Sequence, residues 1–565
     1  MTAAIAGALS PLVATNGLYG LELNSYLWAG GGLFTQVVAL HPMLAALGLG
    51  YRAMRTGQGL TLTGALIGVV MMCHIVYGYF TALTMGMLWL LPLAGSTRRE
   101  RFWRLGWIGA TSMALTAFAL LPLVTDGAFL NRSRWEPVWK WDSFGAAAVI
   151  EWLFTGQLMD FGRMPLLTVA AAVGAGMAAW AIYRSKDTVE RFLLGGAIFW
   201  ILLFFGRPAW GAALLLLGMT QDMHIHRAIG PVQIFLLFLA AMGVAGAWQK
   251  YKVAMAVLGL LALVPMVQER ARMFTLNREW GERNLRVNEA AAPVVNRVID
   301  LARNAGGRTY AGLGANWGAN LKVGDVPVYA RLARAHVPAL SYLYHAMPLA
   351  ADLMVRFDEQ NVAQYRLFHI RTVIGAVGAR MPGFLLQSET AGTLGVWQAP
   401  GGGAFECVDV PAAMRYTREN FYPMNDQWLQ SDWVGRRQHI LMHRDADTPP
   451  GMMAVAPDGR LPALPASAGT PGEVVGESDL IATVEAARDC YVMLKASWHP
   501  GWRVTVDGQQ AEFVMVSPGF PAVKVGAGRH KVAFAYESGT GRYWLALAGL
   551  LAVIGLGWAE RRRRR

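Results

Sequence analysis

A short polar segment between apolar stretches holds the densest group of chemically versatile side chains in this sequence. Gln221 to Arg227 (QDMHIHR) brings an acid, two imidazoles and a guanidinium together, just before an apolar run that begins near Pro231. A helix starting there would turn free backbone N–H groups and the positive end of its dipole toward an anion. Arg227, with His226 and His224 beside it, is therefore predicted to bind phosphate, because a guanidinium can grip two phosphate oxygens at once.

The same segment also suggests metal chemistry. Asp222, His224 and His226 alternate along the chain and carry the oxygen and nitrogen donors that divalent cations accept. Asp222 is the candidate metal ligand and a divalent cation the candidate cofactor. A loop that displays solvated side chains has the same spacing, and this alternative stays open because no third and fourth ligand can be placed.

A second polar segment, Thr125 to Arg163, interleaves charged residues with tryptophans. An indole ring can stack on the apolar face of a sugar while nearby polar groups bind the sugar hydroxyls. We predict a substrate-binding role for Trp139, Trp141, Asp142 and Asp126. A belt of aromatic residues at a membrane surface has the same composition and is the alternative.

The elements that must position these side chains are strongly apolar. Hydrophobic types make up 54% of the 565 residues and charged types 15%, with a mean hydropathy of +0.32. This balance excludes a disordered chain, a collagen and an ordinary soluble enzyme, and it predicts a polytopic membrane protein. The net charge of +13 belongs to the membrane part and the arginine tail, so no nucleic-acid partner is expected.

Apolar runs predict about nine membrane helices, each approaching the roughly 20 residues that a crossing needs. Basic residues flank alternate ends of these runs, and the positive-inside rule assigns those ends to the cytoplasm. Residues 268–541 are then extracytoplasmic. The runs lie near Gly32 to Tyr51, Leu60 to Tyr77, Phe80 to Gly95, Leu105 to Val124, Pro165 to Tyr183, Phe192 to Phe205, Pro231 to Trp248, Val253 to Val267 and Tyr543 to Trp558.

The first residues do not fit this series. Met1 to Ala14 is apolar, but it is too short to cross a membrane and lacks the basic residues of a signal peptide. We expect a truncated N-terminus in which the first half of a helix is missing. A helix lying at the membrane interface is the alternative.

Pattern changes divide the chain into five expected parts. These are a transmembrane domain (1–267), a mixed α/β unit (268–445), a linker or long loop (446–484), an antiparallel β-sandwich (485–541) and a closing transmembrane helix with a basic cytoplasmic tail (542–565). The α/β unit rests on a helical pattern at Asn288 to Ala305, followed by strand patterns at Arg308 to Leu313, Tyr365 to Gly375 and Gly395 to Gln398. The sandwich rests on two-residue alternation after Asp489, with Asp507 and Gly508 as a hairpin turn.

Three cysteines are too few for a disulfide framework. A Cys407–Cys490 bridge would suit an extracytoplasmic region. Two free thiols are the favoured interpretation.

Three short sequences near the C-terminus carry a family resemblance. They are Ser497 to Trp502 (SWHPGW), Val506 to Gly508 (VDG) and Ala527 to His530 (AGRH). This pattern resembles the C-terminal module of bacterial YfhO-like membrane proteins, which are grouped with the GT-C superfamily of integral-membrane glycosyltransferases. The resemblance implies a GT-C-like helical domain in a bacterial cytoplasmic membrane. It also implies transfer of a sugar from a polyprenyl-phosphate donor to an envelope glycan or lipid acceptor, among membrane lipids, on the extracytoplasmic side.

The resemblance further implies a catalytic acid in the first extracytoplasmic loop. Here that loop, Val13 to Gly31, offers Glu22, which becomes the candidate base that takes the acceptor proton. An interfacial acid at a helix end is the alternative for this residue. If the acid of the family lies upstream of Met1, the second hypothesis is a noncatalytic glycan-binding or scaffold component of envelope polysaccharide assembly.

Overall fold

The structure is a computed structural model that describes residues 1–22, 34–185, 189–341, 347–445, 447–456, 460–463, 469–478 and 480–563. Its contacts divide the chain into two units. We call Met1–Val124, Pro137–Gly281 and Thr540–Arg565 the membrane unit, and Thr125–Glu136 with Glu282–Gly539 the β-rich unit. These bounds differ from the five expected parts chiefly because a short segment after the fourth expected helix joins the β-rich unit. The expected start of the first helix, at Gly32, lies outside the described residues.

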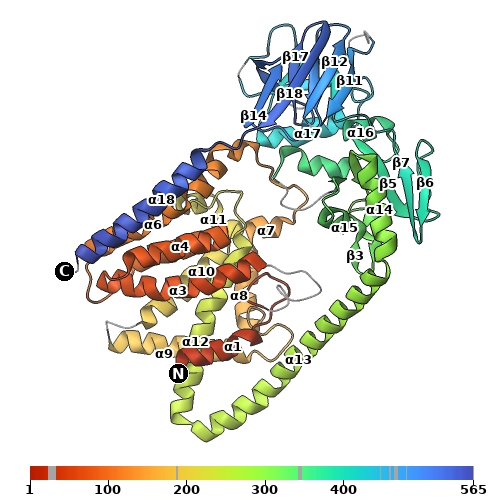
Figure 1. Cartoon of the computed structure of the whole chain (residues 1–565). Coiled ribbons are helices and arrows are strands. Elements are labelled where there is room, and N and C mark those ends of the chain that lie inside the picture. Colours follow the sequence, from red (N-terminus) through yellow and green to blue (C-terminus); the bar gives the residue numbers. More distant parts are fainter. Residues whose placement is uncertain are drawn as a thin grey trace. The chain divides into compact units, whose positions relative to one another are not determined.

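Helices make up the membrane unit (Figure 1). The longer ones are α1 (Thr2–Leu9), α3 (Phe34–Thr56), α4 (Leu60–Cys73), α5 (Ile75–Leu90), α6 (Arg98–Thr125), α8 (Gly145–Thr155), α9 (Leu166–Arg184), α10 (Glu190–Phe204), α12 (Ile229–Lys250), α13 (Lys252–Ala290) and α18 (Gly541–Arg562). Short helical turns connect them, namely α7 (Val138–Asp142), α11 (Arg207–Trp210), η4 (Gly211–Leu217) and η5 (Ile225–Ala228).

Six of the described helices are long and apolar enough to cross a membrane. They are α3, α6, α9, the continuous η5–α12 stretch, α13 and α18. A seventh crossing is possible if α10 and the helix that follows it, bent by 84°, form one span. These helices suit the polytopic membrane protein that the sequence predicts.

The expected count of nine crossings is not met by the helices that the structure describes. The helices α4 and α5 have 14 and 16 residues, which is short for a span. The chain breaks between them at His74, whose backbone is extended with φ −157° and ψ 107°. The expected boundary between the second and third apolar runs, after Tyr77 and before Phe80, was therefore wrong, since these residues continue α5. The helix expected to end near Val267 instead continues to Ala290.

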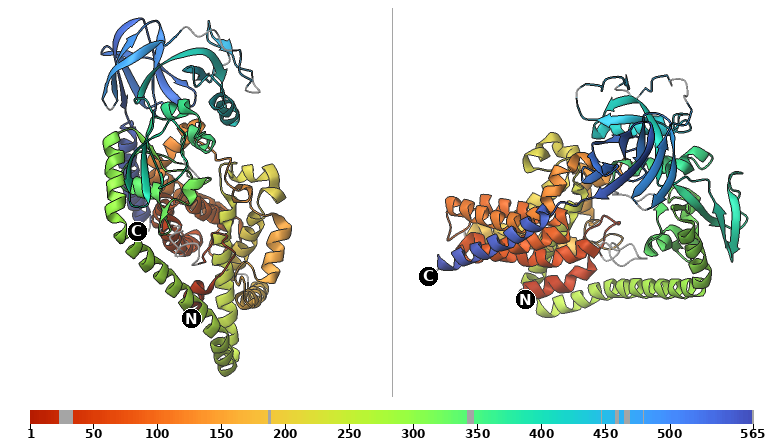
Figure 2. Two further views of the ribbon diagram at one scale, coloured as in Figure 1. Left: turned by 90° about the vertical axis from the view of Figure 1, so that its right-hand side faces the viewer. Right: turned by 45° about the horizontal axis from the view of Figure 1, so that its top comes forward.

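Small residues let the membrane helices approach closely. A Cβ on Gly174 of α9 would collide with the Leu239 carbonyl of α12, and one on Gly549 of α18 with the Ala114 carbonyl of α6. Figures 1 and 2 show α18 running beside α6. Glu560 of α18 also accepts hydrogen bonds from the free N–H groups at the start of α4, at 2.8 to 3.1 Å. The last helix, α18, is thus joined to α6 by a close backbone approach and to α4 by side-chain hydrogen bonds.

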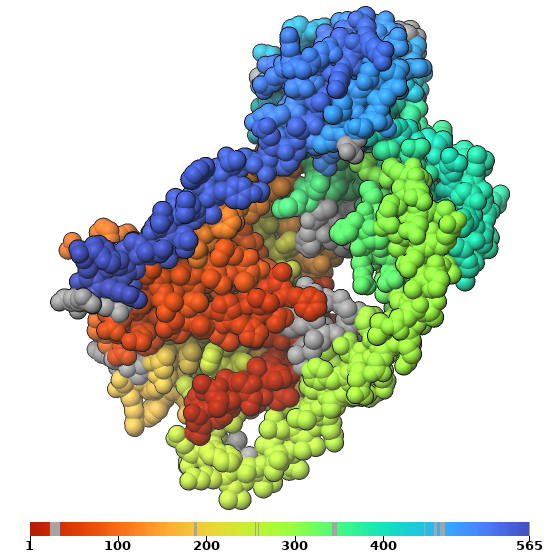
Figure 3. Space-filling model, viewed as in Figure 1, coloured from red at the N-terminus to blue at the C-terminus, as the bar shows by residue number. Residues whose placement is uncertain are grey.

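The helix α1 lies on the outside of the membrane unit, where the space-filling view shows it in red (Figure 3). Its Ala6 and Leu9 are buried, and it packs against α12. With 8 residues it is too short to cross a membrane, as the sequence predicts.

A mixed sheet opens the β-rich unit. Its strand order is β4 (Ala339–Leu340), β1 (Arg308–Tyr310), β5 (Ile370–Ala376), β7 (Leu394–Gln398) and β6 (Leu386–Ala391). The strand β1 runs parallel to both neighbours, whereas β5, β7 and β6 are antiparallel. The helix α14 (Ala292–Ala305) packs on this sheet, which matches the expected helix-to-strand order. Residues Val362–Leu367 form helix α16, so the strand expected from Tyr365 begins only at Ile370, after Asn361 caps the helix.

Two further sheets share the expected sandwich strands. The strands β8 (Phe405–Arg415), β13 (Cys490–Leu494), β17 (Phe520–Val525), β16 (Phe513–Val516) and β9 (Gln438–His443) form a ring that closes because β8 also pairs with β9, with β10 (Met453–Ala454) at its edge. The other sheet has the order β11 (Gly472–Ser478), β12 (Ile481–Ala486), β18 (Gly528–Tyr536), β14 (Trp502–Val506) and β15 (Gln509–Ala511).

Several strand expectations can be compared directly with these sheets. The turn at Asp507 and Gly508 joins β14 to β15, and both residues have positive φ, 52° and 82°, as a tight hairpin turn requires. The strands β11 and β12 lie where a linker was expected. Cys407 and Cys490 are buried and free on neighbouring strands.

Candidate functional site

The segment that carries Glu22 is held inside the membrane unit. Ala14 pairs with Asp160 as a parallel bridge, and its N–H donates to the Met159 carbonyl at 2.9 Å. Asp160 in turn caps α9 by accepting from the N–H groups of Leu167 and Thr168 at 3.2 and 2.8 Å. Burial raises the pKa of Asp160. The chain after α1 is thus anchored to a helix start rather than being an open loop.

Two glutamines fix the end of this segment. The Leu21 N–H donates to Gln233 Oε1 at 2.5 Å, and Gln233 Nε2 donates to the Leu158 carbonyl at 2.8 Å. Gln36 Nε2 donates to the Tyr19 carbonyl at 2.7 Å. Both amides are buried within 1% exposure, where an unpaired amide would be costly. Glu22, the residue after Leu21, is itself fully buried.

Arg227 is connected to this segment through Gln36. Its Nη1 donates to Gln36 Oε1, while the amide nitrogen of the same glutamine bonds the Tyr19 backbone. One amide therefore joins the predicted phosphate-binding guanidinium to the backbone three residues before the predicted base. The structure brings Arg227 and the Glu22 segment together in this way.

His226 lies in an aromatic cluster beside Arg227. Its ring meets the rings of Tyr19 and Trp139 edge-on, with centroids 5.7 and 5.3 Å away. Its Nδ1 is 2.5 Å from the Lys140 carbonyl oxygen, which can only accept. Nδ1 must therefore carry the hydrogen, so a neutral His226 keeps its lone pair at Nε2. Nε2 is buried and has no hydrogen-bond partner among the residues that the structure describes.

The remaining predicted residues of this region lie next to the cluster. Trp141 stacks on His224 with ring centroids 4.0 Å apart. Asp142 forms an ion pair with Arg207 at 3.2 Å, and Arg207 Nη1 also donates to the Trp141 carbonyl at 2.6 Å. Asp142 thus holds the backbone that presents Trp141.

A second group of buried cations bonds the backbone that leads into the Glu22 segment. The Glu269 carboxylate is 3.6 Å from Arg163 Nε and 3.5 Å from Arg270 Nη2. Arg163 donates to the Leu12 carbonyl and Arg270 to the Val13 carbonyl, the latter at 3.2 Å. The side chains of both arginines are at most 13% exposed. Two guanidinium groups therefore share one carboxylate here.

An apolar groove begins beside these arginines. It has a volume of about 850 Å³ and is lined by residues of α9, α12 and α13 together with Leu9. Met164, next to Arg163, and Met266, one helical turn before Arg270, both line it. The groove is therefore lined by apolar side chains with cationic groups near one end.

Two predicted residues lie elsewhere. Asp126 belongs to the β-rich unit, where its Oδ2 is 3.6 Å from His499 Nε2. Asp222 is exposed, and within the described ranges no three His, Cys, Asp or Glu side chains gather as metal ligands. The part of the chain that the structure describes therefore offers no site that fits a divalent cation.

Several residues of this site do not stand out from local sequence patterns. Tyr19 has no charged residue directly beside it in the chain, whereas Lys140 and Arg270 are each one of several charged residues in their segments (WKWD and QERAR). Gln36 and Gln233 leave a visible signal, since each is a polar amide within an apolar helix (FTQVVAL and PVQIFLL). A buried polar side chain in a membrane helix indicates a hydrogen-bonded partner or a functional site.

Comparisons with known proteins find distant similarity only. No protein-family model matches this chain, and no curated protein matches it. A cryo-EM structure of arabinofuranosyltransferase AftD from Mycobacteria matches with a TM-score of 0.41 and 13% identity, over 95% of this chain and 49% of that one. Two structures of a mutant of the same protein give TM-scores of 0.39 and 0.40 at 12% identity. This chain spans about half the length of those chains.

Proposed function

We propose that this chain is a GT-C-type membrane glycosyltransferase of a bacterial cytoplasmic membrane. It transfers a sugar from a polyprenyl-phosphate donor to an envelope glycan or lipid acceptor on the extracytoplasmic side, where residues 268–541 lie. The single observation that supports this best is the Gln36 amide, which bonds Arg227 with its oxygen and the Glu22 segment with its nitrogen. A transferase needs a base and an anion-binding cation near each other, and a bridge from Arg227 to the backbone three residues before Glu22 supports such a pairing.

The donor lipid occupies the apolar groove in this proposal. Its hydrocarbon chain packs against α9, α12 and α13, whose groove-lining side chains are almost all apolar. The lipid phosphate is held by Arg227, a group that can bind two phosphate oxygens. Arg163 and Arg270 attract the same anion where it leaves the groove. Both are buried, and the two guanidinium groups share the one Glu269 carboxylate between them.

The reaction is an inverting displacement at the anomeric carbon of the donor sugar. The acceptor hydroxyl oxygen forms a bond to that carbon as the carbon–oxygen bond to phosphate breaks, and the electron pair of the broken bond stays on the phosphate. Glu22 takes the proton of the attacking hydroxyl as general base. Arg227 stabilises the negative charge that grows on the phosphate, the largest electrostatic demand of the step.

His226 and the tryptophans bind and orient substrate. With Nδ1–H donating to Lys140, a neutral His226 accepts a hydrogen bond from a sugar hydroxyl at Nε2. With its Nδ1–H already bonded to Lys140, His226 donates to phosphate from Nε2 only when protonated, whereas His224 can donate through the one N–H that a neutral imidazole carries. Trp139 and Trp141 offer ring faces for a sugar, and Asp142 acts through Arg207 by positioning Trp141.

The direct test measures transfer from a panel of radiolabelled undecaprenyl-phosphate sugars by the full chain in lipid nanodiscs. We expect Arg227→Gln to lower transfer by roughly a hundredfold or more, as loss of a phosphate-stabilising cation does in other transferases. Arg99→Gln is the matched control, because Arg99 is an exposed arginine of α6. Equal transfer by Arg227→Gln and wild type would contradict the phosphate assignment.

A further inference from the structure

The β-rich unit contains a second group of cationic and aromatic side chains that the proposed transfer does not use. Part of it comes from Thr125–Glu136, which we call the strap. Leu130 pairs with Pro348 as an antiparallel bridge, and the Asn131 N–H donates to the Met347 carbonyl at 2.8 Å. The strap is therefore bound to the unit through its own backbone.

Asp352 fixes the strap more firmly. This aspartate is fully buried. Its carboxylate accepts from Asn131 Nδ2 at 3.0 Å and from the Arg134 N–H at 2.7 Å, and its carbonyl accepts from Trp135 Nε1 at 3.2 Å. Three hydrogen bonds from one residue thus set the positions of Arg134 and Trp135.

The helix α17 (Arg418–Leu429) provides the other wall. Thr417 and Asn420 form a capping box at its start, with hydrogen bonds of 3.3 and 2.7 Å. Arg418, Tyr422 and Asp426 follow one another at four-residue spacing and so lie on one face of the helix. Side chains of that face line two pockets.

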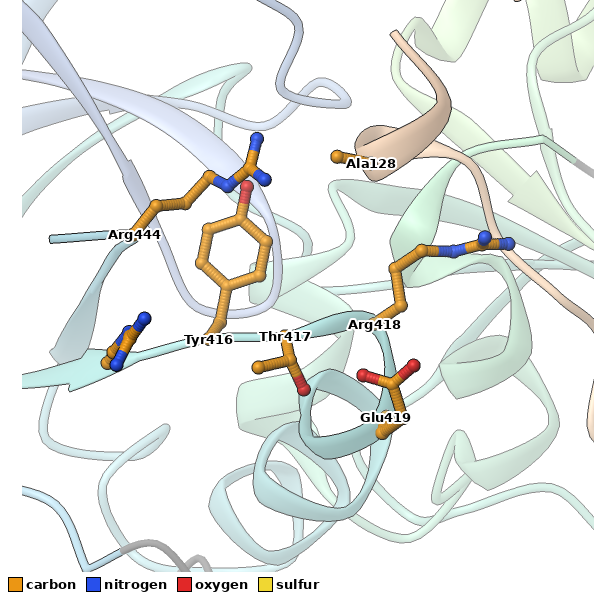
Figure 4. Close-up of a pocket in the computed structure, with 7 residues that line it drawn as sticks. Ala128, Tyr416, Thr417, Arg418, Glu419 and Arg444 are labelled. Carbon is orange, nitrogen blue, oxygen red and sulfur yellow. The ribbon is translucent and has the colours of Figure 1, made fainter. Parts of the chain in front are cut away.

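The first pocket, at the start of α17, is strongly cationic. It has a volume of about 300 Å³, and Arg415, Arg418 and Arg444 line it with Glu419 as the single acid among its lining residues. Figure 4 shows the Arg444 guanidinium beside the Tyr416 hydroxyl, with Ala128 of the strap across the opening. Among the lining residues that the structure describes, guanidinium groups outnumber carboxylates by three to one, which favours an anionic ligand.

The second pocket, further along the same helix face, combines aromatic and charged groups. It has a volume of about 420 Å³ and is lined by Arg134, Trp135, Arg356, Tyr422 and Asp426. Trp135 is 40% exposed, and the Arg134 guanidinium lies 4.8 Å from the Tyr422 ring centre. Arg356 is paired with Asp426 at 2.8 Å. An exposed indole beside fixed hydrogen-bonding groups suits a sugar ring.

We infer that the two pockets together bind an acidic oligosaccharide, whose carboxylate or phosphate lies among Arg415, Arg418 and Arg444. A neighbouring sugar unit stacks on Trp135. Guanidinium groups bind carboxylate and phosphate alike in a two-pronged manner, and the rigid strap keeps the indole in place. This inference does not depend on the proposed sugar transfer, because it uses residues of the β-rich unit alone.

Calorimetric titration of the full chain in detergent tests the inference with four probes. The probes are tetragalacturonic acid, glucose 1-phosphate, neutral maltotetraose and inorganic phosphate. We expect one of the two acidic sugars to bind more tightly than the neutral one, with an affinity that falls as salt is added. Which acidic sugar binds decides between carboxylate and phosphate. Inorganic phosphate binding as tightly as that sugar, or no binding by either acidic sugar, overturns the inference.

Three variants locate the site. Arg444→Gln removes one pocket cation and Trp135→Ala one ring face, and each is expected to weaken the acidic-sugar affinity by roughly tenfold. Arg380→Gln is the matched control, since Arg380 is exposed in the same unit and lines neither pocket. Affinities unchanged in both pocket variants overturn the inference. With tetragalacturonic acid, which carries no phosphate, Arg227→Gln is expected to bind as wild type does, so loss of transfer and loss of glycan binding are separable.

Discussion

Gln36 and Arg227 are 191 residues apart in the chain, yet the glutamine Oε1 accepts a hydrogen bond from the arginine Nη1. The amide nitrogen of Gln36 donates to the Tyr19 carbonyl at 2.7 Å. A single buried side chain therefore links the guanidinium proposed to bind phosphate to the backbone three residues before the proposed base. Its amide shape is needed because it must accept on one side and donate on the other.

Replacing Gln36 tests this bridge. Gln36→Leu leaves the Arg227 guanidinium without its acceptor and the Tyr19 carbonyl without its donor, so we expect a stability loss of about 1–3 kcal/mol and a larger loss of donor binding. Gln36→Glu keeps an acceptor for Arg227 and should retain more donor binding than Gln36→Leu. Donor binding by both variants is measured with undecaprenyl phosphate and the chain in nanodiscs. Equal binding by the two variants would show that the bridge has no role.

Gly20 gives a steric test of the Glu22 segment. A Cβ at this position would collide with Gln233 Oε1 and lie 2.9 Å from Glu22 Oε2. Gly20→Ala must therefore displace one of the two side chains, and overpacking of this kind costs roughly 1–3 kcal/mol. We expect transfer to fall while the chain still folds. Gly7→Ala is the control, because nothing lies within 4 Å of a Cβ there.

The apolar groove predicts a location for the lipid chain. Val173 of α9 lines the groove and is 48% exposed. Val173→Trp should fill part of the groove and lower the crosslinking of a photoactivatable polyprenyl phosphate severalfold. Leu121→Trp makes a similar change at an exposed position of α6, outside the groove, and should leave crosslinking unchanged. Equal crosslinking in both variants would exclude this groove as the lipid site.

The β-rich unit contains a buried ion cluster whose contribution to the stability of the fold depends on pH. Glu406 lies 2.9, 3.1 and 3.2 Å from Arg366, Arg437 and Lys495, respectively. Burial raises the pKa of Glu406, but the three cations outweigh it and hold the pKa below its usual range. A lowered native pKa stabilises the fold above the ordinary carboxyl pKa of about 4.3, and this stabilisation disappears as pH falls through the lowered value.

Glu406→Gln tests that cluster by denaturant unfolding of the full chain. At neutral pH the variant leaves buried cations uncompensated, and we expect it to be less stable by about 3–5 kcal/mol. The difference in unfolding free energy between variant and wild type should become smaller in acid, because the Glu406 carboxylate of wild type is protonated there and also loses its charge. Glu512→Gln, at an exposed glutamate of the same unit, should change little at any pH. A difference in unfolding free energy that stays constant with pH would contradict a lowered pKa of Glu406.

Local pattern predicts the membrane helices but not their interruptions. Apolar length is a property of a short window, so α3, α6, α9, α12 and α18 follow from it. The break at His74 lies in an apolar surrounding, and the tight turn after α10 depends on Gly206, whose added Cβ would collide with the Asp142 carbonyl. Contacts between segments that are distant in sequence determine where these helices are interrupted. A short window of sequence carries no information about such contacts.

The same distinction applies to the strands and the site. Alternation predicts the strands after Asp489, whereas their division between two sheets depends on pairing with earlier strands, of which β8 and β9 lie far upstream and β11 and β12 directly before them. In the site, Arg227, His226 and Trp139 stand in segments dense with polar groups and could be predicted. Tyr19 lies beside His226 only because the chain folds back on itself, which no local pattern shows. Contacts between distant segments likewise place Asp126 in the β-rich unit.

The most direct measurement of the central claim is sugar transfer by Glu22→Gln in nanodiscs, with the panel of labelled undecaprenyl-phosphate sugars and with undecaprenyl phosphate binding measured in parallel. A Gln side chain keeps the size of Glu22 but cannot take the acceptor proton. The account predicts that donor binding stays near wild type while transfer falls by about a hundredfold or more, as for loss of a general base. Transfer at the wild-type rate by Glu22→Gln, with donor bound normally, would contradict it.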